Sequence, residues 1–250
     1  MTPSLTAVMI AHNESANLEG WSKSLDWCDH KLLIDDNSTD DTVQMAKKLG
    51  ITVVSHALSG DFAAQRNFAL QQVTTDWVFF VDGDERVSEA MKKEIQEKLQ
   101  THHETLGYSM RRIDHLFGKT LHHGDMGNVA LLRLGRKDAG EWSGKVHEVW
   151  NMRDKTESLD HALEHYPHPT LNDFLSEINH YSTLRAEELY AQKVQTNYFY
   201  IIAYPAGKFL QDYFLKGGYQ DGEVGLIVAI LMSFHSFLVR GKLWLLWHKK

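Results

Sequence analysis

The run Val81-Asp82-Gly83-Asp84-Glu85 places two carboxylates one residue apart, directly after the apolar stretch W-V-F-F-V. At the end of a strand, two such side chains can face one ligand, and a glycine between them allows close backbone approach. Mg²⁺ and Mn²⁺ prefer oxygen ligands and are commonly held by one or two carboxylates together with substrate phosphates. The run therefore predicts a divalent-cation site at which the metal would offset charge on a departing diphosphate.

Two other polar positions have side chains that suit a nucleotide. Asp35 and Asp36 end an apolar stretch, where a carboxylate can accept a hydrogen bond from a base N–H or from ribose hydroxyls. The alternative is that they only cap the next helix, although residues 37–40 could do so unaided. Arg66 has the guanidinium geometry that suits phosphate oxygens, and a solvated surface arginine is equally compatible with the sequence.

The segment W-S-G-K-V-H-E, residues 142–148, contains two candidate general bases. A transfer reaction in which a hydroxyl attacks needs a group that takes the hydroxyl proton, and both His147 and Glu148 can do this. A His-Glu pair by itself is more often two ordinary surface residues. The sequence alone therefore leaves both interpretations open.

The elements that must position these residues follow from the hydrophobic pattern. Short apolar runs over residues 7–11, 31–34, 51–54 and 77–81 predict buried strands, and the segments between them have helical spacing, notably 62–72 and 88–100. Asn13 is expected to cap the first helix. Alternating strands and helices with continuous apolar strands predict an α/β fold with a mostly parallel sheet covered on both faces. The carboxyl ends of its strands would bring the regions around residues 12–14, 35–36 and 82–84 together.

The second half of the chain is less regular and ends in helices. Residues 107–113 and 128–134 are expected to be strands, Thr170 to begin a helix through a T-x-x-D capping box, and 197–215 to form a helix kinked at Pro205. Residues 226–239 are apolar and precede aromatic and basic residues. This pattern suits either a helix in a membrane interface or a buried core helix, and it is too short to span. We expect domains over 1–165 and 166–250.

Composition narrows the class of protein. The 250-residue chain has a net charge of −7, which argues against general nucleic-acid binding. Its single cysteine, Cys28, excludes a disulfide within the chain and fits a reducing compartment. The N-terminus has no charged segment followed by an apolar one, so we expect no signal peptide and a cytoplasmic location.

The motifs A-H-N-E, D-D-N-S-T-D, Q-R-N-F-A-L, V-D-G-D-E and W-S-G-K-V-H-E occur in this order, followed by the tail Y-F-L-K-G-G-Y-Q-D-G-E-V-G. The set resembles the family-2 glycosyltransferases of the GT-A (Rossmann-like) fold. It is especially similar to the branch that includes bacterial lipopolysaccharide-core glucosyltransferases. The resemblance covers nearly the whole chain and implies a GT-A catalytic domain followed by a helical C-terminal extension.

The resemblance also implies where the donor binds. Ile10, His12 and Glu14 would border the nucleotide, and Asp36, with Asp35 beside it, would contact the uracil of a UDP-sugar. His12 stands where the family more often has tyrosine, and its ring can also stack on a base.

Further roles are implied around the acidic run. Arg66 would lie near the diphosphate, Asp82 would touch the ribose or sugar, and Gly83 would allow close approach. Asp84 would bind Mg²⁺ or Mn²⁺ directly. Glu148 would be the catalytic base, with His147 a helper or metal neighbour, in a place where many relatives have a Glu-Asp pair.

The implied activity is inverting transfer of a sugar from a nucleotide-diphosphate donor to a saccharide or lipid-linked acceptor in cell-envelope glycan synthesis. The enzyme would sit on the inner face of the cytoplasmic membrane through residues 223–250. A nucleotidyltransferase is a weaker alternative, because it would want a Gly-rich basic loop where H-N-E-S stands. Two further alternatives are an inactive, membrane-attached nucleotide-sugar binding module and a structural membrane-surface protein.

Overall fold

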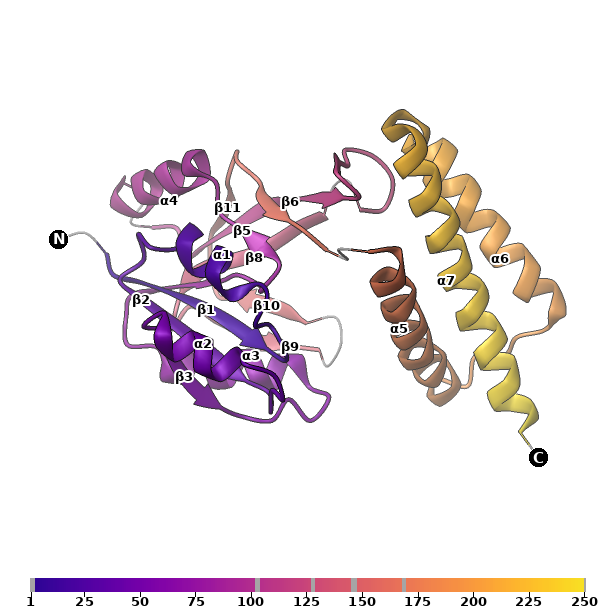
Figure 1. Cartoon of the computed structure of the whole chain (residues 1–250), viewed down its shortest axis with the longest axis horizontal. Coiled ribbons are helices and arrows are strands. Elements are labelled where there is room, and N and C mark those ends of the chain that lie inside the picture. Colours follow the sequence, from indigo (N-terminus) through magenta and orange to yellow (C-terminus); the bar gives the residue numbers. More distant parts are fainter. Residues whose placement is uncertain (1–2, 102–103, 127–128, 145–147, 168–169, 250) are drawn as a thin grey trace. The chain divides into compact units, whose positions relative to one another are not determined.

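The computed structural model describes residues 3–101, 104–126, 129–144, 148–167 and 170–249. Four neighbouring strands near the N-terminus are parallel, namely β1 (Leu5–Ala11), β2 (His30–Asp35), β3 (Thr52–Ser55) and β4 (Trp77–Phe80). Between them and after them run the helices α1 (Leu18–Ser24), α2 (Thr42–Lys48), α3 (Phe62–Gln72) and α4 (Glu89–Thr101). The predicted alternation of strands and helices is confirmed (Figure 1).

Beyond β4 the sheet contains antiparallel pairs, among them β4 with β8 and β12 with β5, which the sequence pattern does not predict. The order is β3-β2-β1-β4-β8-β6-β12-β5, and the added strands are β8 (Val129–Arg136), β6 (Gly107–Leu116), β12 (Leu163–His165) and β5 (Glu85–Arg86). β7 (Lys119–Thr120) and β11 (Thr156–Ser158) also pair with β6. A separate antiparallel hairpin consists of β9 (Gly140–Ser143) and β10 (Val149–Met152).

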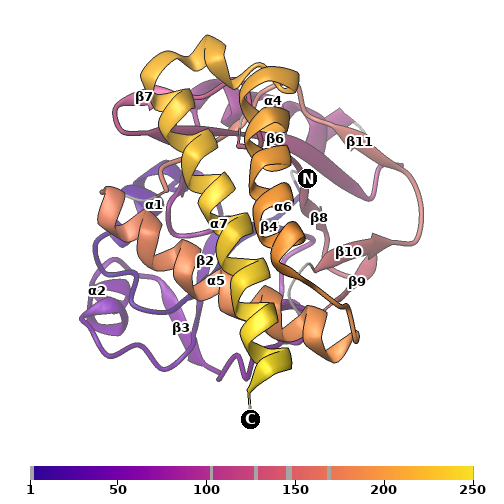
Figure 2. The same ribbon diagram turned by 90° about the vertical axis from the view of Figure 1, so that its right-hand side faces the viewer.

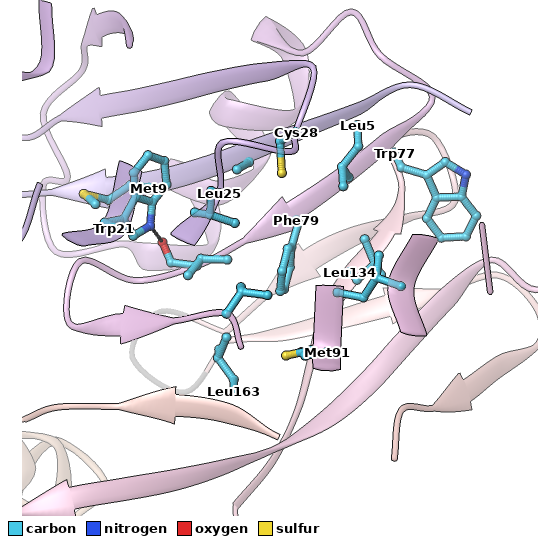
Figure 3. Close-up of a cluster of buried hydrophobic side chains, with 14 of the residues drawn as sticks. Leu5, Met9, Trp21, Leu25, Cys28, Trp77, Phe79, Met91, Leu134 and Leu163 are labelled. Atoms are coloured by element: carbon cyan, nitrogen blue, oxygen red, sulfur yellow. Dashed lines mark hydrogen bonds between the residues drawn. The ribbon is translucent and has the colours of Figure 1, made fainter. Parts of the chain in front are cut away.

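Helices cover both faces of the parallel strands, because the side chains of a strand alternate between two apolar layers. Leu5 and Met9 of β1 pack on one face with Trp21 of α1 and Met91 of α4 (Figure 3). Val8 points to the other face, among residues of α3 and of the β9–β10 hairpin. The indole Nε1 of Trp21 donates to the main-chain O of Val81 at 3.0 Å, so this layer also holds the end of β4.

The start of α1 differs from the expectation. Asn17, not Asn13, occupies the position before the helix. Asn13 has a φ of 59°, and its Oδ1 accepts hydrogen bonds from the main-chain N of Thr39 at 2.8 Å and of Asp40 at 3.3 Å. The prediction for Asn13 was wrong because its side chain satisfies the loop after β2 instead of its own helix. Asn13 thereby joins two loops at the carboxyl edge of the sheet.

The chain forms two compact units, one of residues 1–112 and 130–165 and the other of residues 113–129 and 166–250. The second unit contains α5 (Leu171–Ala191), α6 (Tyr198–Leu210), a π-helix η1 (Gln211–Leu215), a 3₁₀ turn η2 (Gly218–Asp221) and α7 (Gly222–His248). Within it α7 lies between α5 and α6 (Figures 1 and 2). The capping box of Thr170 and Asp173 is present as predicted.

The C-terminal helix is longer than its apolar stretch. α7 continues through the basic and aromatic residues to His248 as one helix of 27 residues. By length and composition alone, the segment from Gly218 to His248 could cross a membrane. Six of its residues are buried against other parts of the unit, so α7 is also a packing element.

The tail motif K-G-G-Y-Q-D-G builds the turn before α7. Gly217 and Gly222 have positive φ values of 73° and 65°, which favour glycine. The carboxylate of Asp221 accepts hydrogen bonds from the main-chain N of His122 at 3.2 Å and of His123 at 2.9 Å. This motif therefore ties the loop after β7 to the start of α7 within the second unit.

Candidate active site

The carboxyl ends of β1, β2 and β4 lie at one edge of the sheet because the three strands are parallel neighbours. His12 follows β1 and Asp36 follows β2, and the Nδ1 of His12 lies 2.6 Å from the main-chain O of Asp36. The carboxylate of Asp36 accepts a hydrogen bond from the main-chain N of Leu58 at 2.8 Å. The ring of His12 remains exposed and available for stacking.

Asp35 and Ile10 support this edge from below. Asp35 is buried, and its Oδ1 accepts a hydrogen bond from the main-chain N of Ser38 at 3.2 Å. That contact stabilises the turn after β2, and it does not cap the next helix, which begins at Thr42 after Asp41. Ile10 is half-buried in β1 opposite Ile34 of β2.

Arg66, on α3, is buried beneath this edge. Its Nε donates to Glu148 Oε1 at 2.9 Å, and its Nη2 lies 3.4 Å from Asp82 Oδ1. The guanidinium carbon stands 5.2 Å from the ring centre of Phe80 and 4.9 Å from that of Trp142. Burial, the largest influence, and the charge of nearby Arg133 lower the pKa of Arg66. Arg66 is therefore not a solvated surface residue, and it joins the predicted base to the acidic run.

Asp82 lies between two guanidinium groups. Arg133, in the middle of β8, donates from Nη2 to Asp82 Oδ2 at 2.8 Å, and Arg66 approaches the other oxygen. Burial opposes ionisation of Asp82, but the charges of Arg133 and Arg66 outweigh it and hold the pKa of this carboxyl well below its usual range. Among the described residues, Nη1 of Arg66 and Nη1 of Arg133 have no hydrogen-bond partner. Both Nη1 atoms are buried, and leaving a buried donor without a partner is costly.

The turn around Gly83 packs against two carboxyl groups. A Cβ at Gly83 would stand 2.7 Å from Cδ of Glu14, so only glycine fits there without a shift. Burial, with weaker effects from Asp84 and Asp82, raises the pKa of Glu14 to about 6. Glu85 is fully buried and accepts a hydrogen bond from the main-chain N of Asp82 at 2.8 Å. Burial and the charge of Asp82 raise its pKa to about 7.

Asp84 faces a histidine that is far away in the sequence. Its Oδ2 lies 3.0 Å from Nε2 of His165, and the side chain of Asp84 is about one-third exposed. β12 pairs antiparallel with β5, which places His165 opposite Glu85. A carboxylate oxygen and an imidazole nitrogen at this distance could bind the same metal ion, but that ion would need further ligands. Within the described part of the chain, no group of three or more acidic, His or Cys side chains could hold a metal ion.

The predicted base Glu148 directly precedes β10, and its side chain is mostly buried against Arg66. The hairpin that carries Glu148 is held by Asn67. The Nδ2 of Asn67 donates to the main-chain O of Trp142, and its Oδ1 accepts from the main-chain N of Trp142, both at 2.9 Å. The other predicted helper, His147, lies outside the described residues.

Two residues of the site, Arg133 and His165, were not predicted from the sequence. Arg133 has a recognisable signal, since it is a charged residue inside the apolar strand A-L-L-R-L. His165 follows no motif, and only the strand pairing of β12 with β5 brings it to Asp84.

The sequence that forms this site matches a known protein family. Residues 6–153 match the model of the glycosyl transferase family 2. The chain belongs to that family. The matched region includes β2 to β10, all but the first residue of β1, and every predicted site residue.

Relatives extend the similarity to the full length. The chain is 28% identical over 254 residues to the lipopolysaccharide core biosynthesis glycosyltransferase LpsC of Rhizobium meliloti, covering 96% of this chain and 92% of LpsC. It is 25% identical over 262 residues to an uncharacterised glycosyltransferase of Rickettsia conorii, covering 97% and 90%. Both alignments therefore extend over the sequence of the second unit.

Solved structures are more distant. The first 349 residues of S. aureus TarS align with a TM-score of 0.48 and 13% identity over 94% of this chain and 89% of that one. Glucosyl-3-phosphoglycerate synthase of Mycobacterium tuberculosis, solved with Mn²⁺ and UDP, aligns with a TM-score of 0.38 and 22% identity over 45% and 44%.

Proposed function

We propose that this glycosyltransferase moves a sugar, with inversion, from a UDP-sugar to a hydroxyl of a saccharide or lipid-linked acceptor in cell-envelope glycan synthesis. The observation that carries the proposal is the chain Glu148–Arg66–Asp82, with contacts of 2.9 and 3.4 Å, which links a candidate base to the acidic run. Similarity to LpsC, a lipopolysaccharide core biosynthesis enzyme by name, supports the acceptor class.

The donor would lie along the carboxyl edge of the sheet. His12 is exposed for stacking on the base, and Asp36 stands beside it for hydrogen bonding to uracil. The unpaired Nη1 groups of Arg66 and Arg133 supply two donors for the diphosphate. In this arrangement Asp82 acts mainly by orienting the two arginines.

Asp84 and His165 are the residues that fit a divalent cation. One carboxylate and one imidazole 3.0 Å apart supply two ligands, and Mn²⁺ and Mg²⁺ usually take the others from diphosphate oxygens and water. The nitrogen ligand favours Mn²⁺ over Mg²⁺, which prefers an all-oxygen shell. When bound, the cation supplies neutralising charge for the departing diphosphate.

The chain's own residues then account for the transfer. The acceptor hydroxyl oxygen attacks the anomeric carbon while the bond to the diphosphate oxygen breaks, and the electron pair leaves with UDP. Glu148 accepts the hydroxyl proton, and Arg66 holds its carboxylate in place. A single displacement of this kind inverts the anomeric centre.

We further propose that the enzyme works on the inner face of the cytoplasmic membrane. The long apolar helix α7 and the neighbouring apolar side chains of the second unit support this. A transferase held there would meet lipid-linked acceptors by diffusion in two dimensions.

Turnover of a panel of UDP-hexoses with Mn²⁺ and a lipopolysaccharide core acceptor tests the function. Glu148→Gln should lower kcat by about 10²- to 10⁴-fold, because a general base contributes about that much. Glu141→Gln changes an exposed glutamate on the same hairpin and should have no effect. Equal turnover by Glu148→Gln, or a product of retained anomeric configuration, would contradict the mechanism. Donor binding without any UDP release would identify a binding module instead.

A further inference from the structure

The acidic turn, residues 82–85, is held by an arginine that lies outside the predicted site residues. Arg86 is the second residue of β5, and its side chain is half-buried. Its Nη1 donates to the main-chain O of Gly83 at 2.6 Å and to that of Glu85 at 2.7 Å. Gly83 and Glu85 are the neighbours of Asp84 in the chain. One guanidinium group therefore holds the backbone on both sides of the proposed metal ligand.

The same guanidinium group also reaches the start of α1. Nη2 of Arg86 donates to the main-chain O of Asn17 at 3.1 Å, and Asn17 directly precedes the helix. Nδ2 of Asn17 in turn donates to Oε2 of Glu14 at 2.8 Å, and the Glu14 carboxyl lies against Gly83. Arg86 therefore connects the acidic turn with the loop after β1, which borders the proposed nucleotide site.

Gly20, within α1, leaves the space that Arg86 occupies. A Cβ at Gly20 would stand 2.7 Å from Nε and 2.9 Å from Nη2 of Arg86, so the guanidinium group would have to move. Gly20 is not among the residues with a positive φ, so its backbone conformation does not require glycine. Glycine inside a helix is less favourable than alanine. The contact with Arg86 therefore explains a glycine at this position.

Arginine suits position 86 because of its geometry as well as its charge. The acidic turn contains three acids, and repulsion among them favours an open turn. A guanidinium group adds positive charge and directs several N–H donors in one plane, so it can bind carbonyl groups of two elements at once. A lysine would supply the charge from a single nitrogen and could not replace this set of contacts.

The held turn brings the two proposed metal ligands together. β5 pairs antiparallel with β12, so Glu85 lies opposite His165, and Oδ2 of Asp84 lies 3.0 Å from Nε2 of His165. We propose that Arg86 is the positioning residue of this site, because its guanidinium group fixes the acidic turn against α1 and so makes Asp84 face His165 before a cation binds. The proposal rests on the proposed function for the roles of Asp84 and UDP. In this role Arg86 contacts neither the cation nor the nucleotide.

Calorimetric titration of UDP into the full-length protein, with and without Mn²⁺, tests the proposal. Mn²⁺ should tighten UDP binding by about tenfold or more in the wild type and by about twofold or less in Arg86→Met, because residues that orient metal ligands typically contribute about 10- to 100-fold to metal affinity. UDP binding without Mn²⁺ should match the wild type. Arg153→Met changes an exposed arginine of the same unit and is the matched control, which should behave like the wild type.

Arg86→Lys separates geometry from charge. It keeps the positive charge but cannot make the three hydrogen bonds in their present geometry, so the effect of Mn²⁺ on UDP binding should stay close to that of Arg86→Met. A Mn²⁺ effect of wild-type size in Arg86→Lys would overturn the proposal. So would a loss of UDP affinity in Arg86→Met that is equal with and without Mn²⁺, because that result indicates a structural role alone.

Gly20→Ala disturbs the same contact and leaves Arg86 in the chain. Its Cβ would displace the guanidinium group, so the Mn²⁺ effect should fall as in Arg86→Met, although alanine favours the helix. In the double variant the methyl group has no guanidinium group to displace, so the double variant should behave like Arg86→Met alone. A Mn²⁺ effect of wild-type size in Gly20→Ala, or additive losses in the double variant, would contradict the proposal.

Hydrogen exchange without metal or nucleotide distinguishes this proposal from the proposed function. The main-chain N of Asp82 donates to Glu85 Oε2 at 2.8 Å, and that of Glu85 donates to the main-chain O of Asp82 at 3.0 Å. Both amides should exchange about tenfold or more faster in Arg86→Met and Gly20→Ala, because the turn opens more often. Unchanged exchange in both variants would overturn the proposal. Faster exchange in the variants, with no Mn²⁺ effect on UDP binding in the wild type, would instead refute the proposed metal site and not the role of Arg86 in holding the turn.

Discussion

At the scale of residues, two arginines lie close to four carboxyl groups. The arginines are Arg66 and Arg133, and the carboxyl groups are those of Glu14, Asp82, Glu85 and Glu148. Arg66 and Arg133 neutralise Asp82 and Glu148, while Glu14 and Glu85 have raised pKa values because burial disfavours their charged forms. The arginines keep one unpaired Nη1 each, which fits a ligand that brings its own negative charge. This balance supports the proposal that a site with so many acids accepts a diphosphate.

Gly83 offers a test of that packing. Gly83→Ala should destabilise the protein by about 1 to 3 kcal/mol, since its Cβ would overlap the carboxyl of Glu14. Combining it with Glu14→Ala removes the overlap, so the double variant should be more stable than the sum of the single effects predicts. Urea unfolding of the four proteins measures the coupling. Strict additivity would show that the two residues do not meet.

At the scale of elements, the Q-R-N segment of α3 connects three parts of the site. Gln65 Nε2 donates to the main-chain O of His56 at 2.6 Å, Arg66 reaches Glu148, and Asn67 binds both polar groups of the Trp142 backbone. One turn of helix therefore positions the loop after β3, the base and the β9–β10 hairpin. The motif is a positioning device, and its Arg66 is also a proposed phosphate ligand.

Asn67→Ala tests this role. The substitution frees the hairpin at Trp142, so Glu148 should be less well placed and kcat should fall by about tenfold to a hundredfold, because small misplacements are costly in catalysis. The KM for the donor should change little, since Asn67 has no contact with the donor residues named above. Steady-state kinetics with each substrate varied measures both constants. A raised donor KM with normal kcat would contradict the positioning role.

The elements also show what a sequence can predict. α3 occupies residues 62–72 as predicted, and the parallel strands lie where short apolar runs occur, because burial and periodicity are local signals. Asp84 and His165 are 81 positions apart, so only the pairing of β12 with β5 brings them together. Asn13 was misassigned because its side chain binds a loop more than twenty residues away. The hydrophobic pattern of the sequence does not indicate which distant segments pair.

At the scale of the whole molecule, charge and apolar surface are divided between the two ends of the chain. The acids dominate the first 193 residues, while residues 194–250 carry twice as many basic as acidic side chains. The first unit contains the residues proposed to bind the metal and the donor, and the second contains most of the exposed apolar side chains.

The burial of Cys28 in the core of the first unit predicts how its thiol reacts. Burial raises the pKa of Cys28 to about 12, compared with about 8.5 for an exposed thiol. At pH 9 the native thiol should stay protonated and unreactive towards an aromatic disulfide reagent, and it should react only as urea unfolds the protein. Absorbance of the released thiolate measures the rate. Rapid stoichiometric reaction of the native protein at pH 9 would contradict the burial of Cys28.

The central claim is that Asp84 and His165 hold a divalent cation that in turn holds the donor diphosphate. Calorimetric titration of UDP into the protein, with and without Mn²⁺, tests it most directly in the wild type, Asp84→Asn, His165→Ala and the surface control Asp138→Asn. Mn²⁺ should tighten UDP binding by about tenfold or more, equivalent to about 1.4 kcal/mol, in the wild type and the control and in neither site variant. UDP affinity that is independent of Mn²⁺, or an Mn²⁺ effect that survives both substitutions, would contradict the claim.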